Sequence, residues 1–329
     1  MSTSASRPVT LADVARRAGT STAVVSYVIN DGPRPVAAAT RERVLAAAAE
    51  LGYRPNRIAR ALRSRVTGVV GLVLADALNP YFGALARYVE QGLAGHGRLM
   101  LMGNAGYCAE RQRQLVERFL AAQVDGLLIT SADAGDDTAA MARAAGVPAV
   151  YLHNGPASGQ TPVVAADNEH AVEEAVAHLR AHGHHDVAFL AGPHDLGPVG
   201  RRRESWQAAA GAGGTLLRSG YSRAEADALI RRLAATDAVP RALIAATDEQ
   251  AIGVLSGASA AGLPVPDGVA VVSLDGTPDS AHTAPSLTVT GQPLESMARQ
   301  AVDLLFDPTG PVTAPHAPLI VRRSCGCET

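Results

Sequence analysis

The chain has 329 residues and is 47% apolar, which allows two or three folded units with buried cores. Its net charge of −2 conceals two opposite parts: residues 1–65 hold 11 Arg and 4 acidic residues, whereas residues 66–329 hold 18 Arg and 27 acidic residues. The chain starts without the apolar stretch of a signal peptide and never reaches the roughly 18 apolar residues of a membrane span. We therefore expect a cytoplasmic protein without membrane contact.

We call residues 1–65 the basic head and residues 66–329 the body. The positive surplus of the basic head predicts a phosphate-backbone partner, while the acidic body should stay off nucleic acid. Every basic residue is Arg, whose guanidinium can grip phosphate or guanine with two hydrogen bonds.

Two short helices are predicted at the start of the basic head. Thr10 is a good N-cap for a helix that ends at Gly19, and Ser21 can cap a second helix. Apolar spacing turns one face of the second helix inward and leaves a polar stripe outside, at Thr22, Ala23, Ser26, Tyr27 and Asn30. This pattern is typical of a helix-turn-helix whose stripe enters a DNA major groove, although it also fits a hairpin used only for packing. A third amphipathic helix is predicted from Arg41 to Leu51, followed by Arg at 57, 60 and 63.

The body alternates apolar strands with helical stretches, such as the helix predicted from Tyr81 to Gly95. Such alternation predicts parallel sheets with crossover helices, and this number of strands favours two doubly wound α/β lobes over one barrel. The predicted strands are 69–74, 99–102, 126–130, 149–152, 187–191, 242–246 and 269–274.

The basic head holds a series of motifs in register, from Val9-Thr-Leu-Ala-Asp-Val-Ala15 to Leu51-Gly-Tyr-Arg-Pro-Asn56. These motifs resemble the lac repressor (LacI) family of transcription regulators. The body carries weaker motifs of the family's core, which resembles periplasmic sugar-binding proteins: Asn79-Pro-Tyr-Phe82, Val124-Asp-Gly-Leu-Leu128, His182-Gly-His184, Gly262-Leu-Pro-Val-Pro-Asp267 and Gln292-Pro293. The resemblance implies an all-α helix-turn-helix domain at 1–54, a hinge helix and linker at 55–66, and an effector-binding core of two Rossmann-like lobes at 67–329. Lobe one would comprise about 67–166 and 292–318, and lobe two about 167–291 and 319–329.

The resemblance also implies which residues bind DNA. Thr22, Ala23 and Tyr27 match positions that read base edges, whereas Ser21, Ser26 and Asn30 match phosphate contacts. Leu62 matches the wedge that enters the minor groove and kinks the operator, although it would also serve as an apolar anchor in a linker. The remaining positions assigned to the DNA contact are Thr10, Tyr53, Asn56, Arg57 and Ala59.

An effector site is expected in the cleft between the lobes. Ligands of such sheets lie beyond the carboxyl ends of strands, which favours Asp76, His153, Thr247, Asp248 and Asp275. The family resemblance adds Arg202 as an effector contact with Asp275 facing it, Tyr81, Phe82 and Tyr221 as stacking residues, and Trp206 beside Arg202. Structural alternatives are an interlobe salt bridge for Arg202, a helix cap for Asp275 and a core position for Trp206. An Arg, a carboxylate and aromatic faces suit a polyhydroxylated or heterocyclic ligand, most simply a sugar or sugar derivative.

Several positions depart from the family pattern. Tyr27 stands where Arg is frequent, so the base that it faces in the operator is open. Ala37 replaces a small polar cap, which costs about 1 kcal/mol of local stability. In the cleft, His153 stands where Asp or Asn is common, and Leu196 and Pro198 replace polar residues, so the sequence does not name the effector.

We expect no metal ion and no cofactor. Cys325 and Cys327 form a lone Cys-Gly-Cys pair at an end of the chain that we expect to be frayed, and His182-Gly-His-His185 falls in a predicted turn. A structural metal site usually needs a second pair of ligands at suitable spacing.

The sequence therefore predicts a DNA-binding transcription regulator, a repressor that binds a near-palindromic operator as a homodimer and responds to a small metabolite. It would act in the cytoplasm, associated with the nucleoid. The alternative is a solute-binding module of a transport system, which would explain the body but not the basic head. An enzyme is disfavoured because no Gly-x-Gly-x-x-Gly follows the first strand and no Gly-x-Ser-x-Gly turn is present. No leucine heptads follow Leu319, so a dimer is expected rather than a coiled-coil tetramer.

Overall fold

The computed structural model divides the chain into two compact units, Met1–Thr67 and Gly68–Thr329. The described residues are 7, 9–30, 32, 34–54, 61, 66–130, 136–156, 160–195, 197–211 and 214–328. Four of the predicted DNA contacts lie outside them, as does Leu196: Asn56, Arg57, Ala59 and Leu62. Within the described part of the chain, no helix combines the length and the apolar character that a membrane crossing requires.

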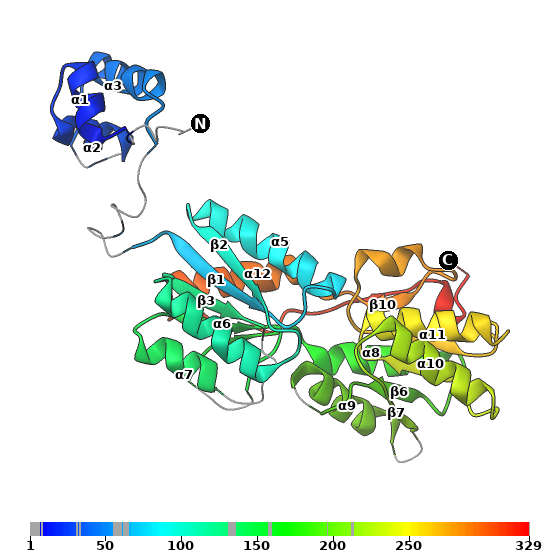
Figure 1. Ribbon diagram of the computed structural model, residues 1–329. Coiled ribbons are helices and arrows are strands. Elements are labelled where there is room, and N and C mark those ends of the chain that lie inside the picture. Colours follow the sequence, from blue (N-terminus) through cyan, green and yellow to red (C-terminus); the bar gives the residue numbers. More distant parts are fainter. Residues whose placement is uncertain are drawn as a thin grey trace, which may run out of the picture. The chain divides into compact units, whose positions relative to one another are not determined.

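The described part of the first unit folds into helices (Figure 1), which confirms the predicted helical class. Its helices are α1 (Leu11–Ala18), α2 (Thr22–Ile29) and α3 (Ala38–Glu50). Thr10 and Asp13 form a capping box at the start of α1, and Gly19 ends α1 in the left-handed conformation that glycine adopts without strain. The Ser21 hydroxyl caps α2 by accepting a hydrogen bond from the Val24 amide. Val14, Val25 and Val44, one from each helix, are fully buried together at the centre.

The third helix begins at Ala38, three residues before the predicted start at Arg41. Ala38 and Ala39 are strong helix formers, so the helix extends toward its N-terminus although Ala37 offers no side-chain cap.

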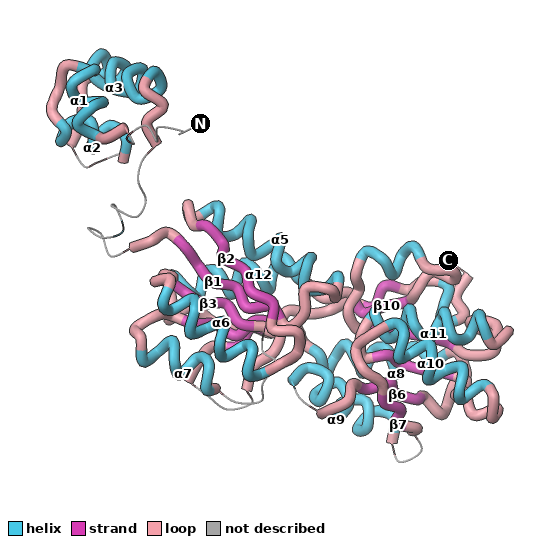
Figure 2. Tube along the Cα trace, viewed as in Figure 1, coloured by secondary structure: helices cyan, strands magenta, loops and turns pink. Residues whose placement is uncertain are grey.

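The second unit contains two parallel sheets with helices on both faces, as predicted (Figure 2). The first sheet has the strand order β2-β1-β3-β4-β5, with α5 and α12 packed on one face and α6 and α7 on the other. Its elements are β1 (Val69–Leu74), α5 (Pro80–Gly95), β2 (Leu99–Asn104), α6 (Ala109–Ala121), β3 (Gly126–Ile129), α7 (Asp137–Ala144), β4 (Ala149–Leu152), β5 (Val163–Val164) and α12 (Leu294–Phe306).

The second sheet has the order β11-β10-β9-β8-β6-β7, and only the β10–β11 pair is antiparallel. Helices α8 and α9 cover one face, and α10 and α11 cover the other. Its elements are α8 (Asn168–Ala181), β6 (Ala188–Ala191), α9 (Gly197–Ala210), β7 (Leu216–Arg218), α10 (Arg223–Ala234), β8 (Ala242–Ala245), α11 (Asp248–Ala260), β9 (Ala270–Ser273), a 3₁₀ turn η1 (Pro278–His282), β10 (Thr288–Thr290), β11 (Leu319–Ile320) and a second turn η2 (Arg323–Cys325).

The chain passes between the two sheets three times: after β5, after β10 and before β11. All seven predicted strands are present within two residues of their predicted ends. Strands β5, β7, β10 and β11 were not predicted because runs of two or three residues carry too little periodicity to recognise.

The end of the chain is anchored rather than frayed, which corrects the sequence-based expectation. The Ser324 hydroxyl donates to the Val271 carbonyl at 2.6 Å and accepts from the Thr288 amide at 2.8 Å. Cys325 is only 1% exposed. Backbone hydrogen bonds to Ser286 hold the same turn against the second sheet.

Candidate functional site

Helix α2 presents the predicted DNA-reading stripe on the surface of the first unit. Thr22 and Ala23 are exposed, and Ser26, Tyr27 and Asn30 are half-buried. The Asn30 side-chain amide donates to the Ser26 carbonyl and hydroxyl at 3.0 and 3.3 Å. The stripe therefore has exposed side chains at the start of α2, and at its end Ser26 and Asn30, which are hydrogen-bonded to each other.

Three other predicted DNA contacts also have structural tasks in this unit. Thr10 is engaged in the capping box, where its hydroxyl donates to the Asp13 carboxylate at 2.6 Å and holds the Asp13 pKa below its usual range. Ser21 caps α2, and Tyr53 packs against the apolar centre of the domain. A DNA contact by these residues would use their backbone groups or the part of each side chain that is still exposed.

The second unit contains a cavity of about 360 Å³ between its two sheets. Seven of the nine predicted effector-binding residues line it: Tyr81, Phe82, His153, Arg202, Tyr221, Thr247 and Asp275. Its other lining residues are Ala75, Asn79, Tyr107, Asn154, Pro193, His194 and Pro198.

Two of the predicted effector-binding residues lie elsewhere, and we correct them. The Asp76 carboxylate accepts from the Leu78 amide at 3.2 Å in the turn after β1 and does not line the cavity. Trp206 is 3% exposed, and its indole N–H donates to the Val187 carbonyl at 2.9 Å, so it is a core residue. Arg202 lies four residues earlier on the same face of α9, one turn closer to the start of the helix, where Pro198 also lines the cavity.

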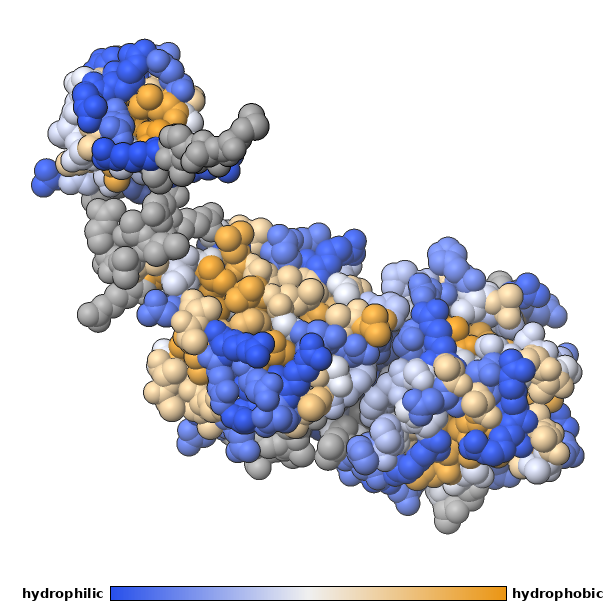
Figure 3. All heavy atoms as spheres, in the orientation of Figure 1, coloured by the Kyte–Doolittle hydropathy of each residue, from blue (hydrophilic) through white to orange (hydrophobic). Residues whose placement is uncertain are grey.

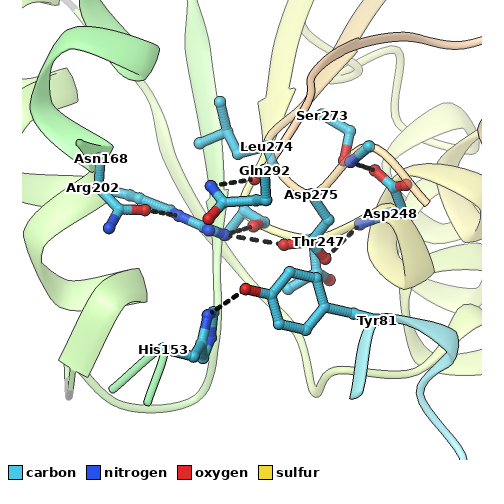
Figure 4. A network of polar contacts seen from close by, with 12 residues as sticks. Tyr81, His153, Asn168, Arg202, Thr247, Asp248, Ser273, Leu274, Asp275 and Gln292 are labelled. Atoms are coloured by element: carbon cyan, nitrogen blue, oxygen red, sulfur yellow. Dashed lines mark hydrogen bonds and ion pairs between the residues drawn. The ribbon is translucent and has the colours of Figure 1, made fainter. Parts of the chain in front are cut away.

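Arg202 forms the polar centre of the cavity (Figure 4). It is 1% exposed, and it donates to Oδ1 of Asn168 at 2.7 Å, to the Ala246 carbonyl at 2.5 Å and to Oδ1 of Asp275 at 3.1 Å. Its Nη2 is buried with no hydrogen-bond partner among the described residues. Both members of the ion pair belong to the second sheet's lobe, so the pair does not bridge the two lobes.

Asp275 follows β9 and is held from two sides. It accepts from Arg202 and from the Asp248 amide, the latter at 3.1 Å, and in this way it also caps the start of α11. Burial raises its pKa to about 6, because desolvation outweighs the opposing charge of Arg202. Asp248, also favoured from the sequence, does not line the cavity and instead accepts from Ser273 and Thr277 at 2.5 and 2.6 Å.

On the facing lobe, the buried Tyr81 and the half-buried His153 form a hydrogen-bonded pair. The Tyr81 hydroxyl lies 2.7 Å from Nδ1 of His153 (Figure 4). Burial, together with the nearby Arg202 charge, lowers the pKa of His153 to about 3, and burial raises the pKa of Tyr81. At neutral pH both groups are therefore uncharged. His153 has a φ of +71°, a left-handed conformation that few residue types tolerate.

Aromatic rings form one wall of the cavity. The ring centroids of Phe82 and Tyr107 are 6.3 Å apart, and those of Tyr107 and Tyr221 are 5.2 Å apart across the two lobes. Tyr221 lies so close to Gly192 that a Cβ there would come within 2.1 Å of its hydroxyl, so a larger residue at 192 would displace the Tyr221 ring. The sequence reasoning missed Asn79, Tyr107 and Asn154, although the strand-end rule that favoured His153 applies to the segments after β1, β2 and β4 as well.

Hydrogen bonds around Arg202 and around Asp275 extend to the segments that connect the lobes. Asn168, which accepts from Arg202, donates to the Ala166 carbonyl at 2.9 Å at the first crossing. At the second crossing, the Gln292 side-chain amide donates to the Leu274 carbonyl at 3.2 Å, and its backbone amide donates to the Asp275 carbonyl. Arg202 and Asp275 are thus hydrogen-bonded to residues near the first and the second of the three crossings, and a ligand that contacts them lies next to both.

Comparison with known proteins agrees with this two-part organisation. A model of bacterial regulatory proteins of the lacI family matches residues 10–56, and a periplasmic binding protein-like domain matches residues 176–325. The HTH-type transcriptional regulator MalR of Streptomyces coelicolor is 34% identical over 326 residues, which cover 94% of this chain and 93% of that protein.

Two solved structures are similar over almost the whole chain. A crystal structure of the lac repressor dimer bound to operator and the anti-inducer ONPF has a TM-score of 0.85 and 28% identity, covering 97% of this chain and 99% of that one. A complex of the transcriptional regulator CelR with cellobiose has a TM-score of 0.67 and 30% identity, covering 97% and 100%. The chain therefore belongs to the lacI family of bacterial regulatory proteins and is a ligand-responsive, DNA-binding transcription regulator.

Proposed function

We propose that this protein is a repressor that binds a near-palindromic operator as a homodimer and responds to a sugar or sugar derivative in the cavity of its second unit. The observation that carries the ligand assignment is the buried Arg202–Asp275 pair facing an aromatic wall, with Nη2 of Arg202 unpaired as far as the described residues go. Hydroxyl groups can accept from an arginine and donate to a carboxylate, while the apolar face of a sugar ring stacks on aromatic rings. The similarity to the cellobiose complex of CelR supports the same ligand class.

The ligand would act by changing how the two lobes are held. Tyr107 and Tyr221 approach the cavity from different lobes, and the Arg202 and Asp275 networks reach two of the three crossings. A ligand shifts such an arrangement only by the difference between its affinities for the two states. The proposal therefore requires that the ligand bind one lobe arrangement more tightly than the other.

Thermal-shift measurements with monosaccharides, disaccharides, polyols and nucleobases test the ligand class, because a ligand of the folded state raises the unfolding temperature. We expect a sugar to raise it, and Arg202→Met to remove the shift and the response of DNA binding to that sugar. Arg201→Ala, an exposed neighbour on α9, is the matched control. Since Arg202→Met leaves Asp275 unpaired, Tyr221→Leu tests the stacking wall without breaking an ion pair. A sugar response that survives both Arg202→Met and Tyr221→Leu contradicts the assignment.

DNA reading is assigned to the exposed stripe of α2, and the minor-groove wedge to Leu62, which lies outside the described residues. The operator is obtained by selection from random-sequence DNA, and affinities are compared at one salt concentration. Leu62→Ala should weaken operator binding far more than binding to random DNA, because a wedge acts only where the duplex is kinked. Arg63→Ala, expected to remove a phosphate contact, should weaken both by a similar factor. Equal losses on both DNAs for Leu62→Ala would contradict the wedge.

A further inference from the structure

Two histidines and two cysteines that are far apart in the sequence converge at one end of α8. His178 lies in the last turn of α8 and His182 is its C-cap residue, while Cys325 and Cys327 belong to the anchored end of the chain. One ligand atom from each of the four lies within 4.8 Å of the other three. Neither the cavity nor the DNA-binding stripe uses these side chains.

The distances among the four ligand atoms fit a small tetrahedral site. Nε2 of His178 is 3.2 Å from Sγ of Cys325 and 3.9 Å from Sγ of Cys327, and Nε2 of His182 is 3.2 Å from Sγ of Cys327. Two sulfurs at about 2.3 Å and two nitrogens at about 2.0 Å from one tetrahedral centre would be separated by about 3.3–3.8 Å. These three spacings bracket this range, and every other pair of ligand atoms lies within 4.8 Å, so the four groups are close enough to surround one ion.

Local structure directs all four groups to the same place. A spacing of four residues puts His178 and His182 on one face of the helix, with ring centroids 4.9 Å apart. Gly326, between the cysteines, has a φ of +104°, which glycine adopts without strain and which reverses the chain so that both sulfurs face α8. The Thr288 hydroxyl donates to Sγ of Cys325 at 3.0 Å, a hydrogen bond that also suits a thiolate.

We propose that His178, His182, Cys325 and Cys327 bind one zinc ion that fastens the C-terminal turn to α8. Two imidazole nitrogens and two thiolates are the ligand set of structural zinc sites, whereas magnesium and calcium prefer oxygen ligands. Binding joins segments about 145 residues apart, so the ion stabilises the second lobe. Asn168, which supports Arg202 in the cavity, lies ten residues before His178, or about 15 Å along the helix. The zinc ion would therefore be a structural component separate from the effector site.

Another group of possible ligands, His170, Glu174 and His316, provides an internal control. It lies near the start of α8, contains no sulfur, and has two exposed histidines and a half-buried Glu174. Nitrogen and oxygen ligands on a surface bind divalent ions weakly and with little selectivity. Substitution of His316 therefore distinguishes zinc held by this group from zinc held by the four-residue site.

The test uses the full-length protein, purified under reducing conditions, loaded with zinc and dialysed against metal-free buffer. Elemental analysis should find one zinc per chain in the wild type and in Cys108→Ser, His185→Ala and His316→Ala. Cys327→Ser and His182→Ala should each lose it, and because both positions are outside the core, circular dichroism should show an unchanged fold. Cobalt(II) in place of zinc should give the intense visible absorption of a tetrahedral thiolate site, and Cys327→Ser should abolish it.

Removal of the metal gives a second readout. A strong chelator should lower the unfolding temperature of the wild type and leave those of Cys327→Ser and His182→Ala unchanged. Reduced wild-type protein that retains no zinc overturns the proposal, and so does zinc retained equally by the Cys327→Ser/His182→Ala double variant. Loss of zinc in His316→Ala alone would assign the ion to the other group and reject this site.

Discussion

At the scale of single residues, the cavity is made of side chains whose charge is controlled by burial. Arg202 and Asp275 are almost completely buried and form an ion pair, while His153 is held neutral by desolvation and by the nearby guanidinium. The positions after strands pointed to His153, Thr247 and Asp275, whereas the family resemblance supplied the other predicted residues that line the cavity. Their protonation states did not follow from the sequence, because they depend on which neighbours exclude water.

His153 makes the stability of the protein depend on pH. Its pKa is lowered to about 3 in the folded protein, against 6.5 when exposed, so the unfolded chain binds more protons between these values. Above pH 6.5 this histidine costs the folded protein nothing. As the pH falls below 6.5, the free energy of unfolding decreases, by on the order of 2 kcal/mol between pH 7 and 5. His153→Asn keeps a residue that tolerates the left-handed conformation and removes the titrating group.

Denaturant unfolding at pH 7 and pH 5 measures this effect. We expect the wild type to lose more stability than His153→Asn on acidification, while Asp275, present in both proteins, cancels from the comparison. His185→Asn, at an exposed position, should behave like the wild type. If the His153→Asn protein loses as much stability as the wild type, then His153 binds a proton equally well in the folded and the unfolded protein, and the prediction is wrong.

At the scale of elements, local signals were sufficient for most helices and strands. Thr10, Ser21 and Gly19 marked helix ends correctly because capping depends on neighbouring backbone groups alone. Longer buried strands were recognised by their continuous apolar runs. The early start of α3 shows the limit of this reasoning, since two alanines extend a helix without any capping signal.

The uncapped start of α3 leads to a stability prediction. Ala37 has the extended backbone of an N-cap residue but no side-chain acceptor for the first amides of the helix. Ala37→Ser should stabilise the head domain by about 1 kcal/mol, because the hydroxyl can accept one of these amides. Hydrogen exchange of α1–α3 amides in the full-length protein measures the gain. Ala39→Ser, inside the helix, is the control and should stabilise nothing.

At the scale of the whole molecule, the β2 edge of the first sheet exposes several apolar side chains. Strand β2 ends the first sheet, and Leu99, Leu101 and Met102 on it are 52%, 39% and 52% exposed. In Figure 3 apolar side chains gather over the region of β1 and β2. Exposed apolar patches of this kind usually mark protein contacts, and an open sheet edge increases the tendency to associate.

We therefore predict that this edge contributes to the proposed homodimer. Leu101→Glu should shift the molecular mass measured by light scattering from dimer toward monomer, because a carboxylate would be buried without a partner. Leu216→Glu is a matched control, since Leu216 is equally exposed, at 39%, on β7 at the edge of the second sheet. If Leu101→Glu remains dimeric at the concentrations where the wild type does, the dimer uses another surface.

The sequence by itself determined the features that depend on neighbouring residues: the charge of the basic head, the helix caps, the apolar periodicity and the motifs that mark the family. Tertiary structure alone decided which side chains meet. Trp206 lies in the core and Arg202 lines the cavity, although both belong to one helix. The Cys-Gly-Cys pair lies next to His178 and His182, which are some 145 residues away in the sequence. The physical reason is that local signals act over a few bonds, whereas burial, pKa and ligand geometry depend on the path of the whole chain.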